Sequence, residues 1–412
     1  MIMKYTAIII SIGSELLLGR TINSNLGYLG QELSPLGAPV KRGYDISDDP
    51  FEIQKALKEA WQDADLVITT GGLGPTKDDL SRQAIADFFG KELLFCEATW
   101  DYIQKMFWKR RNMEIPESNK AQAMVPEGFE VLENTQGTAP ALHYSEGGKH
   151  FFALQGVPRE MKHSFETHIR PLIKREYPQA EALLQKDFNT FGIGESALAE
   201  IIHEEDLPSD VSLAWLPQTG RVDLRITTTN KESFQKAEEY IKSKARKYIW
   251  GENEESPAEA LLNELRKRKL TLAAVESCTG GLLQKYITDV PGSSDVFKGG
   301  IVSYANEVKE RLLFIPPVVL KKHGAVSLLT ASCMLDGVKR LIPVSVAVSI
   351  TGIAGPDGGS KEKPVGTVFM GFEIQGKVAV EKEVFRGNRV EIRHRAAEYT
   401  ILKLLEFIRK GF

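Results

Sequence analysis

The chain has 412 residues, 26% of them charged and 42% hydrophobic, and its formal net charge is −3 at pH 7. This balance is typical of two or three globular domains of about 100–200 residues, and the small charge predicts neither a nucleic-acid partner nor a membrane surface. No apolar run reaches the ~18 residues that a membrane-spanning helix needs. Cys96, Cys278 and Cys333 lie far apart without Cys-x-x-Cys spacing, which argues against a disulfide framework and favours a reducing cytoplasm.

The first 90 residues alternate between strand-like and helix-like segments. Apolar runs predict buried strands at Tyr5–Ile12 and Asp65–Thr70, with another strand-like segment at Val40–Ile46. Leucines at helical spacing after Asn23, and the start signal Ser47–Pro50, predict the helices between them. This order implies an α/β domain with a doubly wound parallel sheet, whose ligands bind at the carboxyl ends of the strands. We therefore expect a site in the loops after the first and third strands.

Residues 176–252 have a different pattern, which predicts a small α+β connecting domain. Polar and apolar residues alternate from Arg221 to Thr227, as in a half-exposed strand, and no catalytic cluster accompanies them. The Glu-rich segment Glu252–Pro257 closes with Ser-Pro and indicates a linker. The predicted domains therefore cover residues 1–175, 176–252 and 253–412.

The last domain again alternates strand and helix, which predicts a second α/β domain. One strand leads through the loop Glu276–Gly281 into a helix, and Asn306 is the expected N-cap of the next helix. A second glycine-rich loop, Thr351–Gly359, follows a later strand, and a strand hairpin and a long helix complete the chain. The strands before this hairpin are predicted at 270–275, 301–304 and 344–350.

Two potential nucleophiles, Ser277 and Cys278, stand side by side at the end of the first of these strands. A serine close to a helix N-terminus lies where free N–H groups and the helix dipole favour negative charge, although it could equally be a simple helix cap. A nucleophilic serine needs a base, and the histidines of this domain, His323 and His394, are predicted to lie in a surface turn and in a charged helix, where both are expected to be solvated. Lys309 falls at the third position of its helix, where the positive helix end disfavours an ammonium group, unless it is an ordinary exposed lysine.

Three segments of this domain resemble one known family. Val275–Gly281, Tyr304–Lys309 and Thr351–Pro356 closely resemble, in this order, the motifs of the C-terminal domain of the competence/damage-inducible protein CinA family, the nicotinamide-nucleotide amidohydrolases. The resemblance implies that Ser277 is the nucleophile and that Lys309 activates it. It also implies that the other motif residues line the pocket: Tyr304, which could relay a proton or orient the lysine, Thr351 and Gly352.

The implied reaction is hydrolysis of the carboxamide of nicotinamide mononucleotide to nicotinate mononucleotide and ammonia, without a cofactor. Acyl transfer to Ser277 would create an oxyanion, for which the backbone N–H groups of Thr279, Gly280 and Gly281 are the expected donors. Cys278 is expected to be a small buried neighbour, because no imidazole or other thiolate-stabilising partner is evident.

The 5′-phosphate of this substrate requires a cationic or N–H cradle. Arg386, Arg389 and Arg393, near the start of the last helix, are the candidates. Arg389 and Arg393 share one helix face because they are four residues apart. The alternative is a basic helix start that is merely solvated.

The resemblance continues through the first 170 residues. Gly13–Leu17 with Asn23 and Asn25, followed by Thr70–Asp79, resemble the CinA N-terminal domain, which is similar to the molybdopterin-binding fold. In the family this domain is associated with metal-dependent ADP-ribose pyrophosphatase activity. The residues expected to bind the nucleotide are Gly13, Ser14, Glu15, Asn23, Gly71, Gly72, Gly74, Thr76, Gly137 and Thr138.

The residue types of these loops fit a phosphate and a metal ion. The three glycines of the second loop would let backbone N–H groups approach an anionic phosphate or pterin. Asp78 and Asp79, with Glu15 opposite, offer oxygen ligands for a divalent ion of the Mg or Co type. The alternative is that Asp79 caps the next helix and Asp78 is solvated. Gln155 stands where the family usually has proline, which leaves the geometry of its loop open.

The resemblance covers essentially the whole chain, because CinA proteins carry a small KH-like domain between the other two. Residues 180–250 contain no basic Gly-x-x-Gly loop, so we expect no RNA binding. A homodimer is implied by the resemblance. Three functions stay open: an amidohydrolase acting through Ser277, an ADP-ribose pyrophosphatase acting through Asp78 and Asp79, and a non-catalytic nucleotide- or pterin-binding protein.

Overall fold

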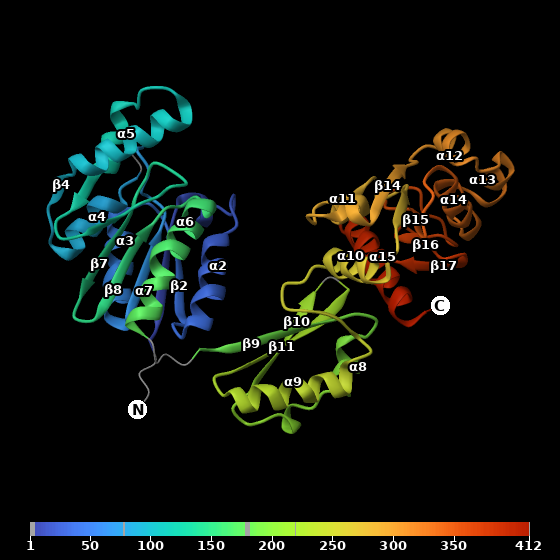
Figure 1. Cartoon of the computed structure of the whole chain (residues 1–412), viewed down its shortest axis with the longest axis horizontal. Coiled ribbons are helices and arrows are strands. Elements are labelled where there is room, and N and C mark those ends of the chain that lie inside the picture. The colour runs from blue at the N-terminus through green and yellow to red at the C-terminus, as the bar shows by residue number, and fades with distance from the viewer. Residues whose placement is uncertain (1–4, 77–78, 178–181, 219, 412) are drawn as a thin grey trace. The chain divides into compact units, whose positions relative to one another are not determined.

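The computed structural model describes residues 5–76, 79–177, 182–218 and 220–411, and the chain forms two compact units (Figure 1). The first contains the chain up to Gln185 together with Thr228–Lys231, and the second contains the rest. Within the described part of the chain, no helix combines the length and apolar character that crossing a membrane requires.

The first unit is built on a six-stranded sheet of order β2-β1-β3-β8-β7-β6. Its first four strands are parallel, whereas β7 and β6 pair in antiparallel fashion. The strands are β1 (Ala7–Ile12), β2 (Val40–Ile46), β3 (Leu66–Thr70), β6 (Glu130–Leu132), β7 (Ala141–Glu146) and β8 (Lys149–Leu154), with β4 (Leu93–Phe95) and β5 (Met124–Pro126) in a separate ribbon. The helices are α1 (Ser14–Leu17), α2 (Ser24–Leu33), α3 (Pro50–Asp63), α4 (Ser81–Phe89), α5 (Glu97–Arg111), α6 (Pro158–Ser164) and α7 (Arg170–Glu176).

Helices cover both faces of this sheet because its central strands are apolar on both sides. All six residues of β1 are buried. Ile8 and Ile10 belong to a core shared with α3 and α4, whereas Ala7 and Ile9 belong to a second core shared with α2 and α7. Continuous apolar strands of this kind are typical of parallel sheets that are buried on both faces. The predicted doubly wound α/β fold is confirmed, with an antiparallel edge added.

The second unit begins with a four-stranded sheet of order β10-β11-β9-β12. Leu224 and Ile226 of β11 pack with Ala237 and Ile241 of α9 in a core of their own. The elements are β9 (Leu184–Thr190), α8 (Glu195–Ala199), β10 (Ser212–Gln218), β11 (Arg221–Thr228), α9 (Lys231–Ala245) and β12 (Ile249–Glu252).

The C-terminal part is built on a five-stranded sheet of order β14-β13-β15-β16-β17, in which the first three strands are parallel and the last two antiparallel. The strands are β13 (Leu272–Glu276), β14 (Phe297–Val302), β15 (Val346–Gly352), β16 (Thr367–Ile374) and β17 (Lys377–Val384). The helices are α10 (Pro257–Arg268), α11 (Leu282–Thr288), α12 (Asn306–Leu313), α13 (Pro317–His323), α14 (Leu328–Leu341) and α15 (Arg389–Lys410).

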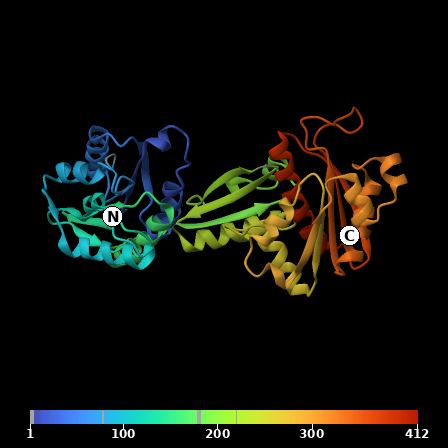
Figure 2. The ribbon, with the colours of Figure 1, turned by 90° about the horizontal axis from the view of Figure 1, so that it is seen from above.

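This sheet also has a core on each face. Ala274 of β13 packs with α10, α11 and α15, whereas Ala273 and Val275 pack with α12, α13 and α14. Figure 2 shows the long red helix α15 on one side of the sheet and the orange helices on the other. The strand predicted at 301–304 lies earlier, at Phe297–Val302, because Gly300 permits the close pairing: a Cβ there would lie 2.7 Å from the carbonyl oxygen of Ala274.

Candidate active site

Ser277 lies where the chain leaves β13. Its backbone N–H donates to the carbonyl of Ile350 on β15 (2.8 Å), and its own carbonyl accepts from the N–H of Gly280 (3.1 Å). Gly280 and Gly281 have φ angles of 61° and 92°, in the left-handed region that favours glycine. The turn therefore fixes Ser277 between a strand and helix α11, with 7% of its surface exposed.

Lys309 of α12 contacts this serine from 32 positions further along the chain. Its Nζ lies 3.0 Å from Oγ of Ser277, 2.6 Å from the carbonyl oxygen of Ser303 and 3.1 Å from that of Tyr304. The side chain has no exposed surface, and this burial lowers the pKa of Lys309. A neutral amine has two N–H bonds, which match the two carbonyls, and its lone pair is then directed at the Ser277 hydroxyl.

The physical cause of the lowered pKa differs from the one predicted. The N-cap of α12 is Ala305, so Asn306 is the first helical residue and Lys309 lies one position deeper than expected. Its Nζ contacts carbonyl oxygens rather than free N–H groups. Desolvation, not the positive end of the helix, therefore disfavours the ammonium form.

Cys278, the neighbouring candidate, has a buried thiol. Burial, with a smaller contribution from the Glu276 carboxylate, raises the pKa of Cys278 to about 12. The thiolate is the nucleophilic form of cysteine, and at neutral pH this side chain is almost entirely a thiol. The geometry and the ionisation of the pair both favour Ser277 as the reacting residue.

Glu276 holds the turn after β13 against the start of α11, and the sequence reasoning missed this residue. Its fully buried carboxylate accepts hydrogen bonds from the backbone N–H groups of Gly281 (3.0 Å), Leu283 (3.2 Å) and Gln284 (2.9 Å). The carboxylate thus occupies the anion-binding end of α11, so a substrate phosphate cannot use it. A charged residue that closes an apolar strand directly before this turn is the signal that could have identified it.

The same contacts change the expected oxyanion donors. The N–H of Gly280 is bound to Ser277, and that of Gly281 is bound to Glu276. In the described structure, the Cys278 and Thr279 N–H groups of this turn have no oxygen acceptor and lie against the Cys278 sulfur. Of the three predicted donors, Gly280 and Gly281 are therefore already bound to oxygen acceptors, whereas Thr279 is bound only to a sulfur, which is a weak acceptor. The Thr279 hydroxyl is also buried without a hydrogen-bond partner.

The three predicted arginines do not act together. Arg389 donates to the carbonyl of Gly355 (2.6 Å) and to the exposed hydroxyl of Tyr304 (2.8 Å). Arg393 donates to the carbonyl of Thr279 (2.7 Å). Helix α15 thereby connects all three sequence motifs of this domain. Arg386 is separate from them, because it lines a different cavity that contains no residue of these motifs.

Thr351 and Gly352, expected in the pocket, mainly shape the second glycine-rich loop. The buried hydroxyl of Thr351 donates to the carbonyl of Ala325 (2.7 Å). A Cβ at Gly352 would lie 2.8 Å from the carbonyl oxygen of Thr367. Both positions therefore fix the end of β15 beside Ser277, whose N–H is bound to the same strand.

The residues predicted in the N-terminal domain gather at the carboxyl edge of its sheet, around a cavity of about 530 Å³. Of the predicted residues, this cavity is lined by Gly13, Glu15, Gly71, Gly72, Gly74, Asp79 and Thr138. The others lie close by: Ser14 donates to Asp48 in the lining, Thr76 donates to Asp79, Gly137 adjoins the Glu160 side chain, and Asn23 caps α2. Sequence reasoning missed Asp48 and Glu160, which add two carboxylates to the lining.

A metal ion fits the described residues of this cavity poorly. Both carboxylate oxygens of Asp79 are already bound, one by the N–H of Gly74 (2.8 Å) and the other by the N–H (2.9 Å) and hydroxyl of Thr76. Across the described ranges, no group of three or more His, Cys, Asp or Glu side chains is arranged to hold a metal ion. Asp78, the other predicted ligand, lies outside the described residues. Asp79 therefore serves as a cap within its own loop, whereas α4 itself begins after Leu80.

Comparison with known proteins places these two sites in one family. Family models match residues 8–175 (probable molybdopterin binding domain), 185–251 (damage-inducible protein CinA KH domain) and 254–408 (CinA C-terminal domain). A CinA-like protein from Kosmotoga olearia is 42% identical over 413 residues, covering 98% of each chain. The chain belongs to the CinA family. A second CinA-like protein, from Gemmatimonas aurantiaca, is 40% identical over 96% of this chain and 95% of its own.

One solved structure of a CinA protein, from Thermoplasma acidophilum and described as having unknown function, is similar over 40% of this chain and 98% of its own. The identity is 34% and the TM-score is 0.38.

Gln155 is the position at which this CinA-family chain departs from the expected proline. The Gln155 side chain is buried, donates to the carbonyl of Ala139 (2.9 Å) and accepts from the Ser164 hydroxyl (3.0 Å). Its carbonyl accepts from the Thr70 hydroxyl (2.8 Å). The loop is thus held by hydrogen bonds instead of by a fixed φ angle, and it still lines the cavity.

Proposed function

We propose that the C-terminal domain of this CinA-family chain is a serine amidohydrolase that releases ammonia from nicotinamide mononucleotide. The observation that carries the proposal is the buried contact of 3.0 Å between Lys309 Nζ and Ser277 Oγ. Serine–lysine pairs are a recognised means of activating a serine for acyl transfer. The substrate itself is implied by the motifs that this chain shares with its family.

The first half of the reaction forms an acyl-enzyme. Ser277 Oγ bonds to the carboxamide carbon while its proton passes to the neutral Lys309 amine. The carbonyl oxygen becomes an oxyanion, which the N–H groups of Cys278 and Thr279 can stabilise by exchanging their weak bonds to the Cys278 sulfur for bonds to the oxyanion. The C–N bond then breaks, the electron pair leaves with nitrogen, and Lys309 returns the proton so that ammonia departs.

The second half restores the enzyme. A water molecule gives its proton to Lys309 as its oxygen bonds to the acyl carbon. The bond to Ser277 Oγ breaks, the serine recovers its proton from Lys309, and nicotinate mononucleotide is released. Every proton passes through one buried amine, so the neutral form of Lys309 is required in both halves.

The test is ammonia release from nicotinamide mononucleotide by the wild type and by Ser277→Ala. Loss of the nucleophile is expected to reduce kcat by about 10³-fold or more. Ser294→Ala, which changes an exposed serine of the same domain, is the matched control. A folded wild type that releases no ammonia, or a Ser277→Ala variant with full activity, would overturn the proposal.

A second activity, cleavage of ADP-ribose to AMP and ribose 5-phosphate, is favoured by the N-terminal cavity. Its volume suits a nucleotide, and its Gly-rich loop approaches the neighbouring strand so closely that a Cβ at Gly71 would lie 2.1 Å from the carbonyl oxygen of Ile12. Four carboxylates line it: Glu15, Asp48, Asp79 and Glu160. A diphosphate would be repelled by them unless a cation accompanied it. Because the described residues do not form a metal site by themselves, we infer that such a cation would enter together with the diphosphate.

This second proposal is tested by AMP release from ADP-ribose with and without Mg²⁺ or Co²⁺. Asp79→Asn keeps the size of the side chain but removes its charge and one acceptor, so AMP release should fall at least about tenfold. Ammonia release should be unchanged, because Ser277 is in the other unit. AMP release that is unaffected by Asp79→Asn would contradict the assignment.

A further inference from the structure

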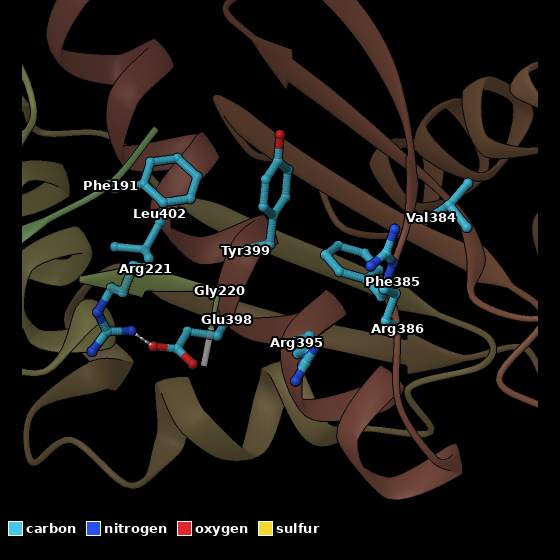
Figure 3. Close-up of a pocket in the computed structure, with 10 residues that line it drawn as sticks. All are labelled: Phe191, Gly220, Arg221, Val384, Phe385, Arg386, Arg395, Glu398, Tyr399 and Leu402. Carbon is cyan, nitrogen blue, oxygen red and sulfur yellow. Dashed lines mark hydrogen bonds and ion pairs between the residues drawn. The ribbon is translucent and has the colours of Figure 1, made fainter. Parts of the chain in front are cut away.

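A cavity of about 310 Å³ lies within the second unit, between the middle sheet and helix α15 (Figure 3). Small-molecule sites usually have volumes of about 300–1,000 Å³. Four segments contribute to its lining. The aromatic and cationic side chains of this lining are Phe191, Arg221, Phe385, Arg386, Arg395 and Tyr399. None of them was placed in the proposed reaction above, and Arg386 is the residue that the active-site geometry left aside.

One wall of this cavity is aromatic. The ring of Tyr399 lies 5.3 Å from that of Phe191 and 5.6 Å from that of Phe385, measured between centroids, in edge-on geometry. The Tyr399 hydroxyl lies within hydrogen-bond distance of Glu381 (3.3 Å) and Glu383 (3.2 Å), which holds its ring in place. Figure 3 shows Tyr399 between Phe191 and Phe385. Such a wall can pack against a planar ring.

The charged groups of the cavity do not balance. Arg221 is neutralised by an ion pair with Glu398, the dashed contact in Figure 3. For Arg386 and Arg395 the described residues provide neither an ion pair nor a hydrogen bond. The Nε atom of Arg395 is buried without a partner, which is costly for a polar group and indicates a missing acceptor. Arg386 and Arg395 therefore line the cavity without a described anionic partner, because Glu398, the acid among the lining residues, is bound to Arg221.

We propose that this cavity binds a small ligand that combines a planar aromatic ring with a phosphate or carboxylate group, the class to which nucleoside monophosphates belong. The ring packs against Tyr399 and its two phenylalanine neighbours. The anionic group accepts hydrogen bonds from Arg395, because guanidinium groups match the geometry of phosphate and carboxylate, and Arg386 adds positive charge to the same lining. The ligand site is distinct from both sites proposed above.

The test is hydrogen–deuterium exchange of the full chain with AMP as the probe. AMP is expected to slow exchange in peptides that cover residues 188–192 and 384–402. Arg395→Gln should raise the Kd measured at these peptides at least about tenfold, because it removes a charge-assisted hydrogen bond. Arg395→Lys keeps the charge but loses the planar guanidinium group, so its Kd should lie between those of the wild type and Arg395→Gln. Arg246→Gln, at an exposed arginine of the same unit, should have no effect.

Two comparison ligands separate the parts of the proposal. Adenosine and ribose 5-phosphate should each bind much more weakly than AMP, because each lacks one half of the recognition. AMP bound in the N-terminal cavity would slow exchange around residues 71–76. Its binding there can therefore be distinguished from protection of residues 384–402. Absence of protection at 384–402 with millimolar AMP, equal protection by ribose 5-phosphate, or protection that survives Arg395→Gln would overturn the proposal.

Discussion

The Nζ atom of Lys309 lies 3.0 Å from the hydroxyl oxygen of Ser277, and the lysine side chain has no exposed surface. Two backbone carbonyls accept its remaining hydrogen bonds. The pair therefore has a fixed geometry before any substrate binds. This preorganisation is what a base must have if it is to take a proton without rearrangement.

The first prediction concerns pH. Burial lowers the pKa of Lys309, and the base is active only in its neutral form, so ammonia release should fall as pH drops through that lowered pKa. An unperturbed lysine titrates near ~10.4, so kcat should reach its plateau at a lower pH than an exposed lysine base would allow. The measurement is kcat against pH for the wild type, with Lys309→Met expected to lose about 10³-fold. A profile that keeps rising to about pH 10, or stays flat down to about pH 5, would argue against this base.

Cys278 should be dispensable for catalysis and slow to alkylate. Its pKa is raised to about 12, so the thiolate fraction near neutral pH is very small. We expect Cys278→Ala to keep ammonia release within about threefold of the wild type, since it removes one small buried atom. Iodoacetamide labelling at pH 8, followed by mass spectrometry of the peptide, should find Cys278 unmodified. Rapid labelling together with loss of activity would instead identify the thiol as the reacting group.

Glu276 should matter for stability as well as for activity. In Glu276→Gln, one of the two acceptor oxygens is replaced by an NH₂ group, which is a donor and cannot accept from the backbone N–H groups. The free energy of unfolding should fall by about 1–3 kcal/mol, because buried N–H groups lose an acceptor. Urea denaturation measures this change, and Glu362→Gln, at an exposed loop position, should change it by less than about 0.5 kcal/mol. An unchanged unfolding midpoint would show that the three bonds are not needed.

Arg389 offers a way to separate phosphate binding from loop support. It holds Gly355 and Tyr304 together and remains exposed at the start of α15. If it also binds the phosphate, Arg389→Met should lower kcat/KM for nicotinamide mononucleotide about 10–100-fold, chiefly through KM. Nicotinamide riboside, which lacks the phosphate, should be affected far less. An equal loss for both substrates would mean that Arg389 only supports the loops.

The alternation of strands and helices, the two α/β domains and the loops that carry the candidate sites could all be predicted from the sequence. These features depend on local patterns: apolar runs such as Ala7–Ile12, helix start signals and glycines at turns. Ser277 and Lys309 could be paired in advance only because their motifs resemble those of a known family. Nothing in the residues between them specifies a distance of 3.0 Å.

The contacts between polar atoms depend on the tertiary structure, and the sequence did not predict them. The tertiary structure buried Lys309 and gave Glu276 the Gly281 N–H group that had been predicted for an oxyanion. It also separated Arg386 from Arg389, although they are three residues apart. In addition, Asp79 accepts hydrogen bonds from Gly74 and Thr76 of its own loop. Hydrogen bonds and desolvation depend on contacts between segments far apart in the chain, and their strength changes over distances of about 1 Å. The hydrophobic pattern, by contrast, is a local property of each segment and can be recognised in the sequence.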